Sequence, residues 1–169
     1  MLTGSESTGK STLAARLAQR YDAPWTPEAA RLYVESRDGA PLGYEHVERI
    51  ARAHIAAVQD ALRRAHGLLF LDTDLISTLV YSRHYYGTCP AWVEREARAR
   101  LADLYLLHHP DVPWQPDPVR DRPSSRDEIH VLFRQALDHF GARYVDVLGD
   151  FGAREARAIE AVDALLSQR

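Results

Sequence analysis

The sequence contains no asparagine, one lysine at position 10 and one cysteine at position 89 among its 169 residues. A single cysteine cannot form an internal disulfide, which fits a reducing compartment. No stretch approaches the roughly 18 consecutive apolar residues of a membrane span, and the amino-terminal residues lack the basic and apolar regions of an export signal. We therefore expect a cytoplasmic protein that does not associate with membranes.

The charge balance offers little to attract polyanions. The chain has 24 acidic and 21 basic side chains and a formal net charge of -3. A protein of this charge has no overall field that would draw it to nucleic acid or to an anionic lipid surface. The length predicts one domain, residues 1–169, that is large enough to bury a substantial core.

The single lysine lies inside a phosphate-binding motif. Residues 4–11, GSESTGKS, match G-x-x-x-x-G-K-[ST] at every fixed position, whereas the other 21 − 1 = 20 cationic side chains are arginines. The glycines allow backbone N–H groups to point at phosphate oxygens, and the compact lysine ammonium fits beside the β- and γ-phosphates where a planar guanidinium would not. The predicted ATP-binding residues are Gly4, Ser5, Glu6, Ser7, Thr8, Gly9, Lys10, Ser11 and Thr12.

Apolar segments alternate with helical patterns along the whole chain. Residues 67–72, 103–109 and 142–149 read as buried parallel strands, each followed by a helical segment. This alternation predicts an α/β phosphate-loop fold with a five-stranded parallel sheet flanked by helices. Only three residues precede Gly4, so we expect either a shortened first strand or a start that has lost residues.

Two helix starts carry clear capping signals. Thr26 as N-cap, followed by Pro27 and Glu28, predicts a helix that runs to about residue 37. Ser125 and Glu128 form the pattern of a capping box for a helix that reaches about residue 139. A long amphipathic pattern predicts another helix over residues 44–65.

Two acids follow the apolar strand at residues 67–72. Asp72 ends this strand, where a carboxylate lies opposite the phosphate loop and can hold Mg²⁺ together with Ser11. Asp74 lies two residues further on, where it can bind an acceptor hydroxyl. Both acids can instead cap the following helix, and for Asp74 the two roles are compatible.

The segment TPEAAR, residues 26–31, offers a third acid near the expected edge of the sheet. Glu28 is placed to orient and deprotonate an alcohol that attacks the γ-phosphate. Arg31, three residues along the same helical face, can pair with Glu28 or with a phosphate. The alternative is that Glu28 only stabilises the helix amino terminus.

Residues 110–123 form a loop rich in proline, aspartate and arginine. Arg120, Arg122 and Arg126 cluster in the overlapping segment VPWQPDPVRDRPSSR, residues 112–126, and on a closing lid such side chains can neutralise the transferred phosphoryl group. The alternative is a solvated charged loop. Trp114 can stack on a planar base, with Trp25, Tyr33, Tyr85 and Tyr86 as further candidates. The eight histidines show no metal-ligand spacing, and His108 and His109 read as structural.

Missing residues narrow the class of phosphate-loop protein. A GTPase reads guanine with N-K-x-D, which a chain with no asparagine and no second lysine cannot contain. AAA-type motors are usually larger and use a polar sensor that is often asparagine. The remaining class is the small phosphate-loop kinase, in which an acceptor lies beside ATP under an arginine lid.

These residues together resemble the bacterial ribosylnicotinamide kinases, the kinase part of bifunctional NAD-salvage proteins that are often labelled AAA-type ATPases. The matching segments are GSESTGKST, the E-x-x-R of Glu28 to Arg31, FLDTD at residues 70–74, VPW at residues 112–114, and Arg120 with Arg126. The TPE segment is also similar to that of deoxyribonucleoside kinases, in which the glutamate is the base for a 5′-hydroxyl.

The resemblance implies phosphorylation of the ribosyl 5′-hydroxyl of nicotinamide riboside by ATP and Mg²⁺, giving nicotinamide mononucleotide. Its catalytic residues would be Lys10, Glu28, Asp74, Arg120 and Arg126, and its substrate contacts Glu28, Arg31, Asp74 and Trp114. No adenylyltransferase segment accompanies this domain, so we expect no onward step to NAD. The alternatives are a kinase for another nucleoside or small alcohol, and a regulatory ATP-binding module.

Overall fold

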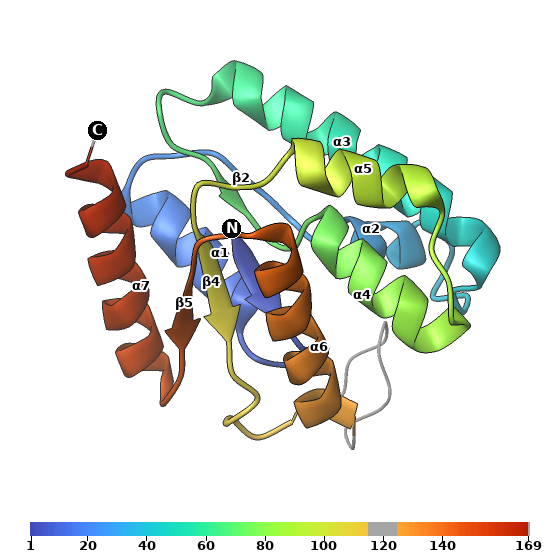
Figure 1. The fold of residues 1–169 in the computed structure, drawn as a ribbon. Helices are drawn as coiled ribbons and strands as arrows, with labels where there is room; N and C mark the ends of the chain where they lie inside the picture. The colour runs from blue at the N-terminus through green and yellow to red at the C-terminus, as the bar shows by residue number, and fades with distance from the viewer. Residues whose placement is uncertain (115–124, 169) are drawn as a thin grey trace.

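The computed structural model describes residues 1–114 and 125–168, in which strands and helices alternate (Figure 1). The strands are β1 (Leu2–Gly4), β2 (Trp25–Thr26), β3 (Phe70–Leu71), β4 (Tyr105–His108) and β5 (Tyr144–Val147). The helices are α1 (Lys10–Arg20), α2 (Ala29–Glu35), the 3₁₀ turn η1 (Tyr44–His46), α3 (Val47–Arg64), α4 (Leu75–Tyr86), α5 (Ala91–Ala99), α6 (Arg126–Phe140) and α7 (Phe151–Leu166). This arrangement confirms the predicted α/β fold with parallel strands flanked by helices.

The prediction of one continuous five-stranded sheet is wrong. The strands form a three-stranded sheet in the order β1-β4-β5 and a separate pair, β2-β3. A single parallel bridge between Leu2 and Asp72 joins them, and the Leu2 carbonyl accepts the Thr73 N–H at 3.0 Å. Thr73 then adopts a φ of 69°, outside the extended region, so the ladder cannot continue.

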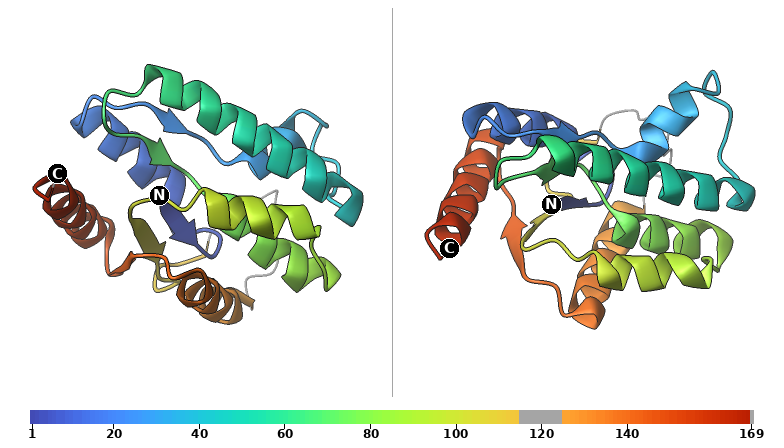
Figure 2. Two further views of the ribbon diagram at one scale, coloured as in Figure 1. Left: turned by 45° about the horizontal axis from the view of Figure 1, so that its top comes forward. Right: turned by 90° about the horizontal axis from the view of Figure 1, so that it is seen from above.

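Alternate residues of β4 pack into two different apolar clusters. Tyr105 and Leu107 belong to a cluster with α4, α5 and α6, whereas Leu106 belongs to a cluster with α1 and α7. A strand presents successive side chains to opposite faces of a sheet, so β4 must be covered on both sides. Figure 2 shows α1 and α7 gathered on one side of the strands and α4, α5 and α6 on the other. The carboxyl ends of β1, β3 and β4 are thereby left to carry the polar loops.

Three predicted helix starts differ from the structure. Thr26 lies in β2, because its carbonyl accepts the Asp72 N–H at 2.9 Å, and Glu28 takes the N-cap position of α2. The pattern at residues 44–65 begins as the 3₁₀ turn η1 before α3. Ser125 occupies the N-cap position of α6, but its side chain makes no capping hydrogen bond, so the capping box is absent. The starts of these three helices therefore depend on contacts with other segments or on backbone geometry, which the sequence motifs do not specify.

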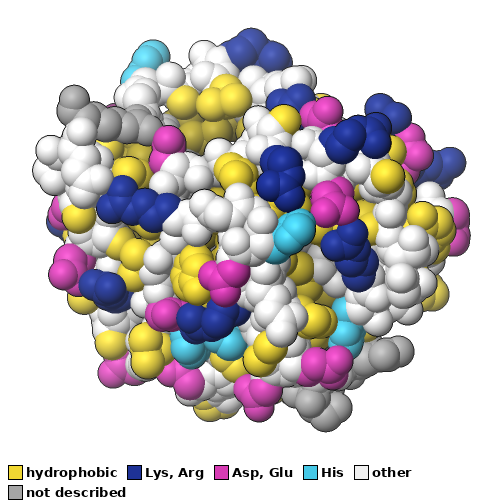
Figure 3. All heavy atoms as spheres, viewed as in Figure 1, with side chains coloured by type: hydrophobic (Ala, Val, Ile, Leu, Met, Phe, Trp, Pro, Cys, Tyr) yellow, Lys and Arg dark blue, Asp and Glu magenta, His cyan; other side chains and the backbone are white. Residues whose placement is uncertain are grey.

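The surface has mixed charge on the face seen in Figure 3, where basic and acidic side chains are interspersed. Among the described residues, none of the helices combines the length and the apolar character that crossing a membrane requires.

Candidate active site

The phosphate loop connects β1 to α1 and is shaped by two glycines with different constraints. Gly4 has a φ of 121°, and a Cβ atom there would lie 2.6 Å from the His108 carbonyl oxygen of β4. Gly9 has a φ of 80° in the left-handed region, although nothing lies within 4 Å of a Cβ at that position. The chain therefore leaves the sheet and enters α1 in a conformation that other residues adopt only with strain.

Lys10 is the first residue of α1 and is 6% exposed. Its Nζ donates a hydrogen bond of 2.6 Å to the Ser5 carbonyl, and the Thr8 hydroxyl donates to the same oxygen at 3.0 Å. The first turn of α1 contains no acidic side chain. A helix amino terminus presents N–H groups and a positive dipole end, which are the features of a polyphosphate site.

Three cationic or titratable groups hold the loop from outside the motif. The His108 Nδ1 contacts the Thr8 carbonyl at 3.0 Å, and the Arg154 Nη1 donates to the same oxygen at 3.3 Å. Arg126 reaches the Ser7 carbonyl with its Nη2 at 3.5 Å and the Val112 carbonyl with its Nη1 at 2.9 Å. The loop is thus fixed by strand β4 and by helices α6 and α7.

Burial sets the protonation of His108. Desolvation, and to a smaller extent the charges of Lys10 and Arg154, lower the pKa of His108 to about 3, although its bond to Thr8 acts in the opposite direction. A carbonyl oxygen accepts hydrogen bonds, so the neutral ring donates from Nδ1. His108 therefore supports the loop without adding a positive charge to the phosphate site.

Arg154 is the residue that the sequence reasoning missed. It is 2% exposed and donates to the Gly149 carbonyl at 2.7 Å and to the His109 carbonyl at 3.0 Å, and it pairs with Asp111. The signal in the sequence is its position on the apolar face of α7, in line with Ala158, Ala161 and Val162. A cation on an apolar helical stripe needs buried partners, which here include the phosphate loop.

Asp72 is 1% exposed and follows β3 directly. Its bridge to Leu2 places it beside β1, the strand that leads into the phosphate loop. A buried carboxylate here, with the Ser11 hydroxyl at the start of α1, supplies the hard oxygen donors that Mg²⁺ prefers. The donor types of the predicted magnesium ligands therefore suit such an ion, and their role stays a prediction.

Asp74 caps helix α4. Its Oδ1 accepts the Ser77 N–H at 3.0 Å, and its Oδ2 accepts the Tyr105 hydroxyl at 2.9 Å. Burial raises the pKa of Asp74, while the Ser77 bond and the nearby His54 lower it. Both carboxylate oxygens thus have structural partners, and an acceptor hydroxyl would have to share them.

Glu28 lies at the N-cap position of α2 and is 3% exposed, yet its side chain makes no capping hydrogen bond. The Arg31 Nη2 lies 3.6 Å from the Glu28 Oε2, which is one of the two pairings expected for Arg31. The carboxylate is therefore held at the wall of a cavity rather than used to begin the helix.

A cavity of about 450 Å³ lies between α2, α3 and α4. Glu28 and Asp74 line it together with Tyr81, Tyr85 and Tyr86, and the rings of Tyr81 and Tyr85 stack with centroids 6.0 Å apart. A volume of this size with aromatic walls and a few polar groups suits a small planar ligand. The two candidate bases and two of the predicted aromatic residues thus meet at one site.

Glu6 joins this cavity to the phosphate loop. It is fully buried, and its Oε2 accepts a hydrogen bond of 3.1 Å from the Tyr81 hydroxyl. Within the described part of the chain, the Glu6 Oε1 has no hydrogen-bond partner. The residue expected only to line the ATP site therefore also contacts the wall of the neighbouring cavity.

The remaining predicted residues are placed only in part. Arg120 and Arg122, with most of the predicted lid, lie outside the described residues. Trp114, Trp25 and Tyr33 are not among the described residues that line the cavity, and Trp25 packs into the core beside α1. The role of Trp114 at the substrate stays a prediction.

Comparisons with known proteins give a consistent family. The model of the AAA domain family matches residues 1–154. The trifunctional NAD biosynthesis/regulator proteins NadR of Escherichia coli (strain K12) and Salmonella typhimurium (strain LT2) are each 29% identical over 174 residues, which cover 99% of this chain. The aligned part is 42% of each relative, so the chain spans less than half of their length.

Solved structures agree with this similarity. A crystal structure of the NadR protein in complex with NAD and AMP-PNP has a TM-score of 0.77 and 29% identity over 97% of this chain and 48% of that one. A NadR structure in complex with NR has the same TM-score and 28% identity over the same shares. The YorR protein from Bacillus subtilis, in complex with phosphorylated GDP, has a TM-score of 0.54 at 18% identity over 98% of this chain and 94% of that one, which shows a shared fold alone. The resemblance predicted from the motifs is confirmed.

Proposed function

The chain belongs to the AAA domain family, and on that premise we propose that it is an ATP-dependent kinase for the ribosyl 5′-hydroxyl of nicotinamide riboside. The product would be nicotinamide mononucleotide. The observation that carries the proposal is the cavity that Glu28 and Asp74 line, which is joined to the phosphate loop through the Glu6–Tyr81 hydrogen bond. The NadR structures with NR and with AMP-PNP support this choice of acceptor and of donor.

On the donor side, Lys10 and the loop N–H groups bind the β- and γ-phosphates. The Lys10 ammonium, which contacts the Ser5 carbonyl, would turn to the phosphate oxygens when ATP enters. Ser11 and Asp72 would hold Mg²⁺, which supplies positive charge to the phosphates when bound. Thr12 follows Ser11 in α1 and would bind the α-phosphate.

On the acceptor side, Glu28 orients the 5′-hydroxyl and takes its proton. The 5′-oxygen forms a new bond to the γ-phosphorus, the bond from that phosphorus to the β,γ-bridging oxygen breaks, and ADP leaves with that electron pair. Asp74 is the second candidate for the base. Arg126 contacts the Ser7 carbonyl, and this contact supports the proposal that Arg126 would neutralise charge at the transferred group with the help of Arg120.

Product analysis tests the proposal. The protein is incubated with MgATP and a panel of nicotinamide riboside, ribonucleosides, deoxynucleosides and small alcohols, and mass spectrometry identifies the compound that gains a phosphate. Phosphate on nicotinamide riboside at the highest kcat/KM supports the assignment. A higher kcat/KM for another acceptor replaces the substrate, whereas ATP binding with no phosphorylated product supports a regulatory module.

A further inference from the structure

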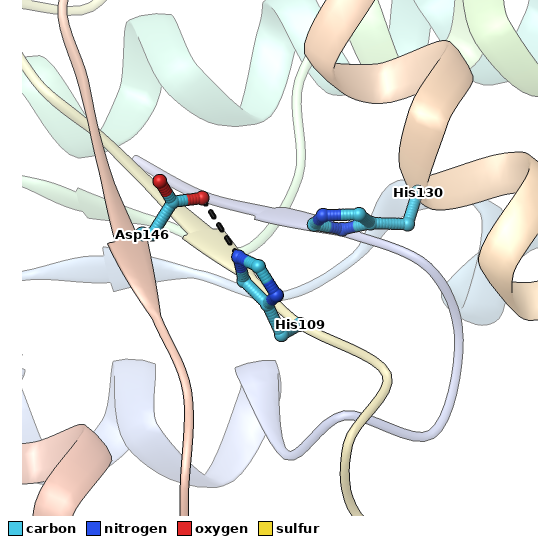
Figure 4. Close-up of side chains that lie close together, drawn as sticks. All are labelled: His109, His130 and Asp146. Carbon is cyan, nitrogen blue, oxygen red and sulfur yellow. Dashed lines mark hydrogen bonds and ion pairs between the residues drawn. The ribbon is translucent and has the colours of Figure 1, made fainter.

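A second cluster of side chains with metal-binding atoms lies at the end of β4, next to His108, which contacts the phosphate loop. It consists of His109, which follows β4, Asp146 on β5 and His130 on α6 (Figure 4). From these positions the geometry points to a binding site for a divalent transition-metal ion held by two imidazoles and one carboxylate. This site is distinct from the magnesium ligands Ser11 and Asp72.

The distances suit a common ion. One donor atom from each of the three side chains lies within 4.8 Å of the other two, and the His109 Nε2 is 2.8 Å from the Asp146 Oδ1. Two ligands about 2.1 Å from one zinc ion in tetrahedral geometry lie about 3.4 Å apart. The site therefore needs side-chain movements of the order of 1 Å, without any change in the strands.

His130 supplies an observation that the hydrogen-bond network does not explain. This residue is 9% exposed, and its Nδ1 has no hydrogen-bond partner among the described residues. Its ring packs on the ring of His109 with centroids 4.3 Å apart. A buried nitrogen without a partner is costly, and a metal ion would satisfy it.

The backbone of His108 holds the His130 ring in place through a hydrogen bond. Backbone bonds of this kind commonly orient histidines that ligate metals. The ring is thus held beside His109 and Asp146.

Arg134 would compete with a metal ion for the Asp146 carboxylate. Its Nη2 donates to the Asp146 Oδ1 at 2.6 Å, the same oxygen that contacts His109. The ion would displace the proton on the His109 Nε2, which passes to solvent, and would share the carboxylate with the guanidinium. Imidazole and carboxylate donors suit zinc and its neighbours better than Mg²⁺ or Ca²⁺.

A bound ion would join three elements behind the phosphate loop. The His109 carbonyl accepts from Arg154, which also donates to Thr8. The ion would therefore fix the residue after β4 to β5 and to α6, the helix that begins with Arg126. Its role would be structural, because none of its ligands lines the acceptor cavity.

The test measures zinc binding to the whole chain, with excess MgCl₂ present to occupy the magnesium site. Equilibrium dialysis with ZnCl₂ alone as the probe, followed by elemental analysis, compares wild type with His130→Phe, which keeps a ring against His109, and with Asp146→Asn. The exposed His66 provides the control His66→Asn. We expect one zinc ion per wild-type chain, at least tenfold weaker binding in both cluster variants, and no change in the control.

The variant Arg134→Gln distinguishes a metal-binding role of the cluster from a role in hydrogen bonding alone. Removal of the competing guanidinium should tighten zinc binding several-fold, and zinc should raise the Tm of wild type but not of His130→Phe. Circular dichroism checks that each variant folds. The inference is overturned if the wild-type protein binds no zinc. It is also overturned if His66→Asn weakens zinc binding as much as the cluster variants do. Both outcomes can be read even if one cluster variant does not fold.

Discussion

The Tyr81 hydroxyl donates a hydrogen bond of 3.1 Å to the Glu6 carboxylate, and this contact connects the acceptor cavity with the phosphate loop. Both side chains are buried, and they come from helix α4 and from the phosphate loop, 75 residues apart. A ligand that moves Tyr81 must also change the surroundings of Glu6. The two proposed substrates would thus be coupled through one hydrogen bond.

Replacing Tyr81 by phenylalanine tests this coupling. Tyr81→Phe removes the partner of a buried carboxylate, so the free energy of unfolding should fall by about 1–3 kcal/mol and kcat/KM for the acceptor should fall with it. Urea unfolding and steady-state kinetics measure the two effects. The control is Tyr44→Phe, because Tyr44 is 41% exposed. Equal effects in the two variants would contradict a specific role for the Glu6 contact.

Lys10 should tolerate neither alanine nor arginine. Lys10→Ala removes the charge at the phosphates, and Lys10→Arg replaces a compact ammonium by a guanidinium that the narrow loop does not fit, so kcat/KM should fall by about 10²-fold or more in both. Arg20→Ala, at the exposed end of α1, is the matched control. Full activity of Lys10→Ala would remove the basis of the proposed function.

The Glu28 side chain should be the general base. Glu28→Gln keeps the shape of the side chain but cannot accept the 5′-proton, so kcat should fall by about 10²-fold or more while ATP binding stays unchanged. The exposed Glu35→Gln in the same helix is the control. Single-turnover measurements with MgATP and nicotinamide riboside report the chemical step. An unchanged rate would assign the base to Asp74.

His108 should make folding sensitive to acid. Its pKa is lowered from 6.5 to about 3 in the folded chain, mainly by burial, so between these values the unfolded state binds a proton that the folded state does not. Stability is therefore present above about pH 6.5 and is lost as the pH falls towards 3. Urea unfolding at pH 6 and pH 4 should show wild type losing about 1.4 kcal/mol more per pH unit than His108→Gln. The exposed His66→Gln should follow wild type, and a parallel loss in all three proteins would contradict the prediction.

The sequence predicts best those features that depend on neighbouring residues. The phosphate loop is contained in eight consecutive positions, and the turn before α1 follows from the glycines themselves. Asp74 caps α4 as its position suggested. Local signals alone do not suffice, however, because Thr26 lies in β2 and the Ser125 side chain makes no capping hydrogen bond.

Features that combine distant segments could not be predicted in this way. The division of the strands into two sheets depends on the backbone at Thr73, and the contact of Arg154 with the phosphate loop joins residues 146 positions apart. His109, His130 and Asp146 have no spacing that a metal motif would recognise, because each comes from a different element. The expectation that the histidines are only structural rested on spacing alone.

The close approach of Gly4 to the His108 carbonyl makes the first glycine of the motif a requirement of the apo protein. A methyl group at this position would clash with the backbone of β4, so a substitution would disturb the folded protein before any nucleotide binds. At Gly9 the space is open and only the backbone angle is demanding. The two glycines of the motif are therefore required for different reasons. The neighbouring strand leaves no room for a side chain at the first glycine, and the backbone angle at the start of α1 favours glycine at the second.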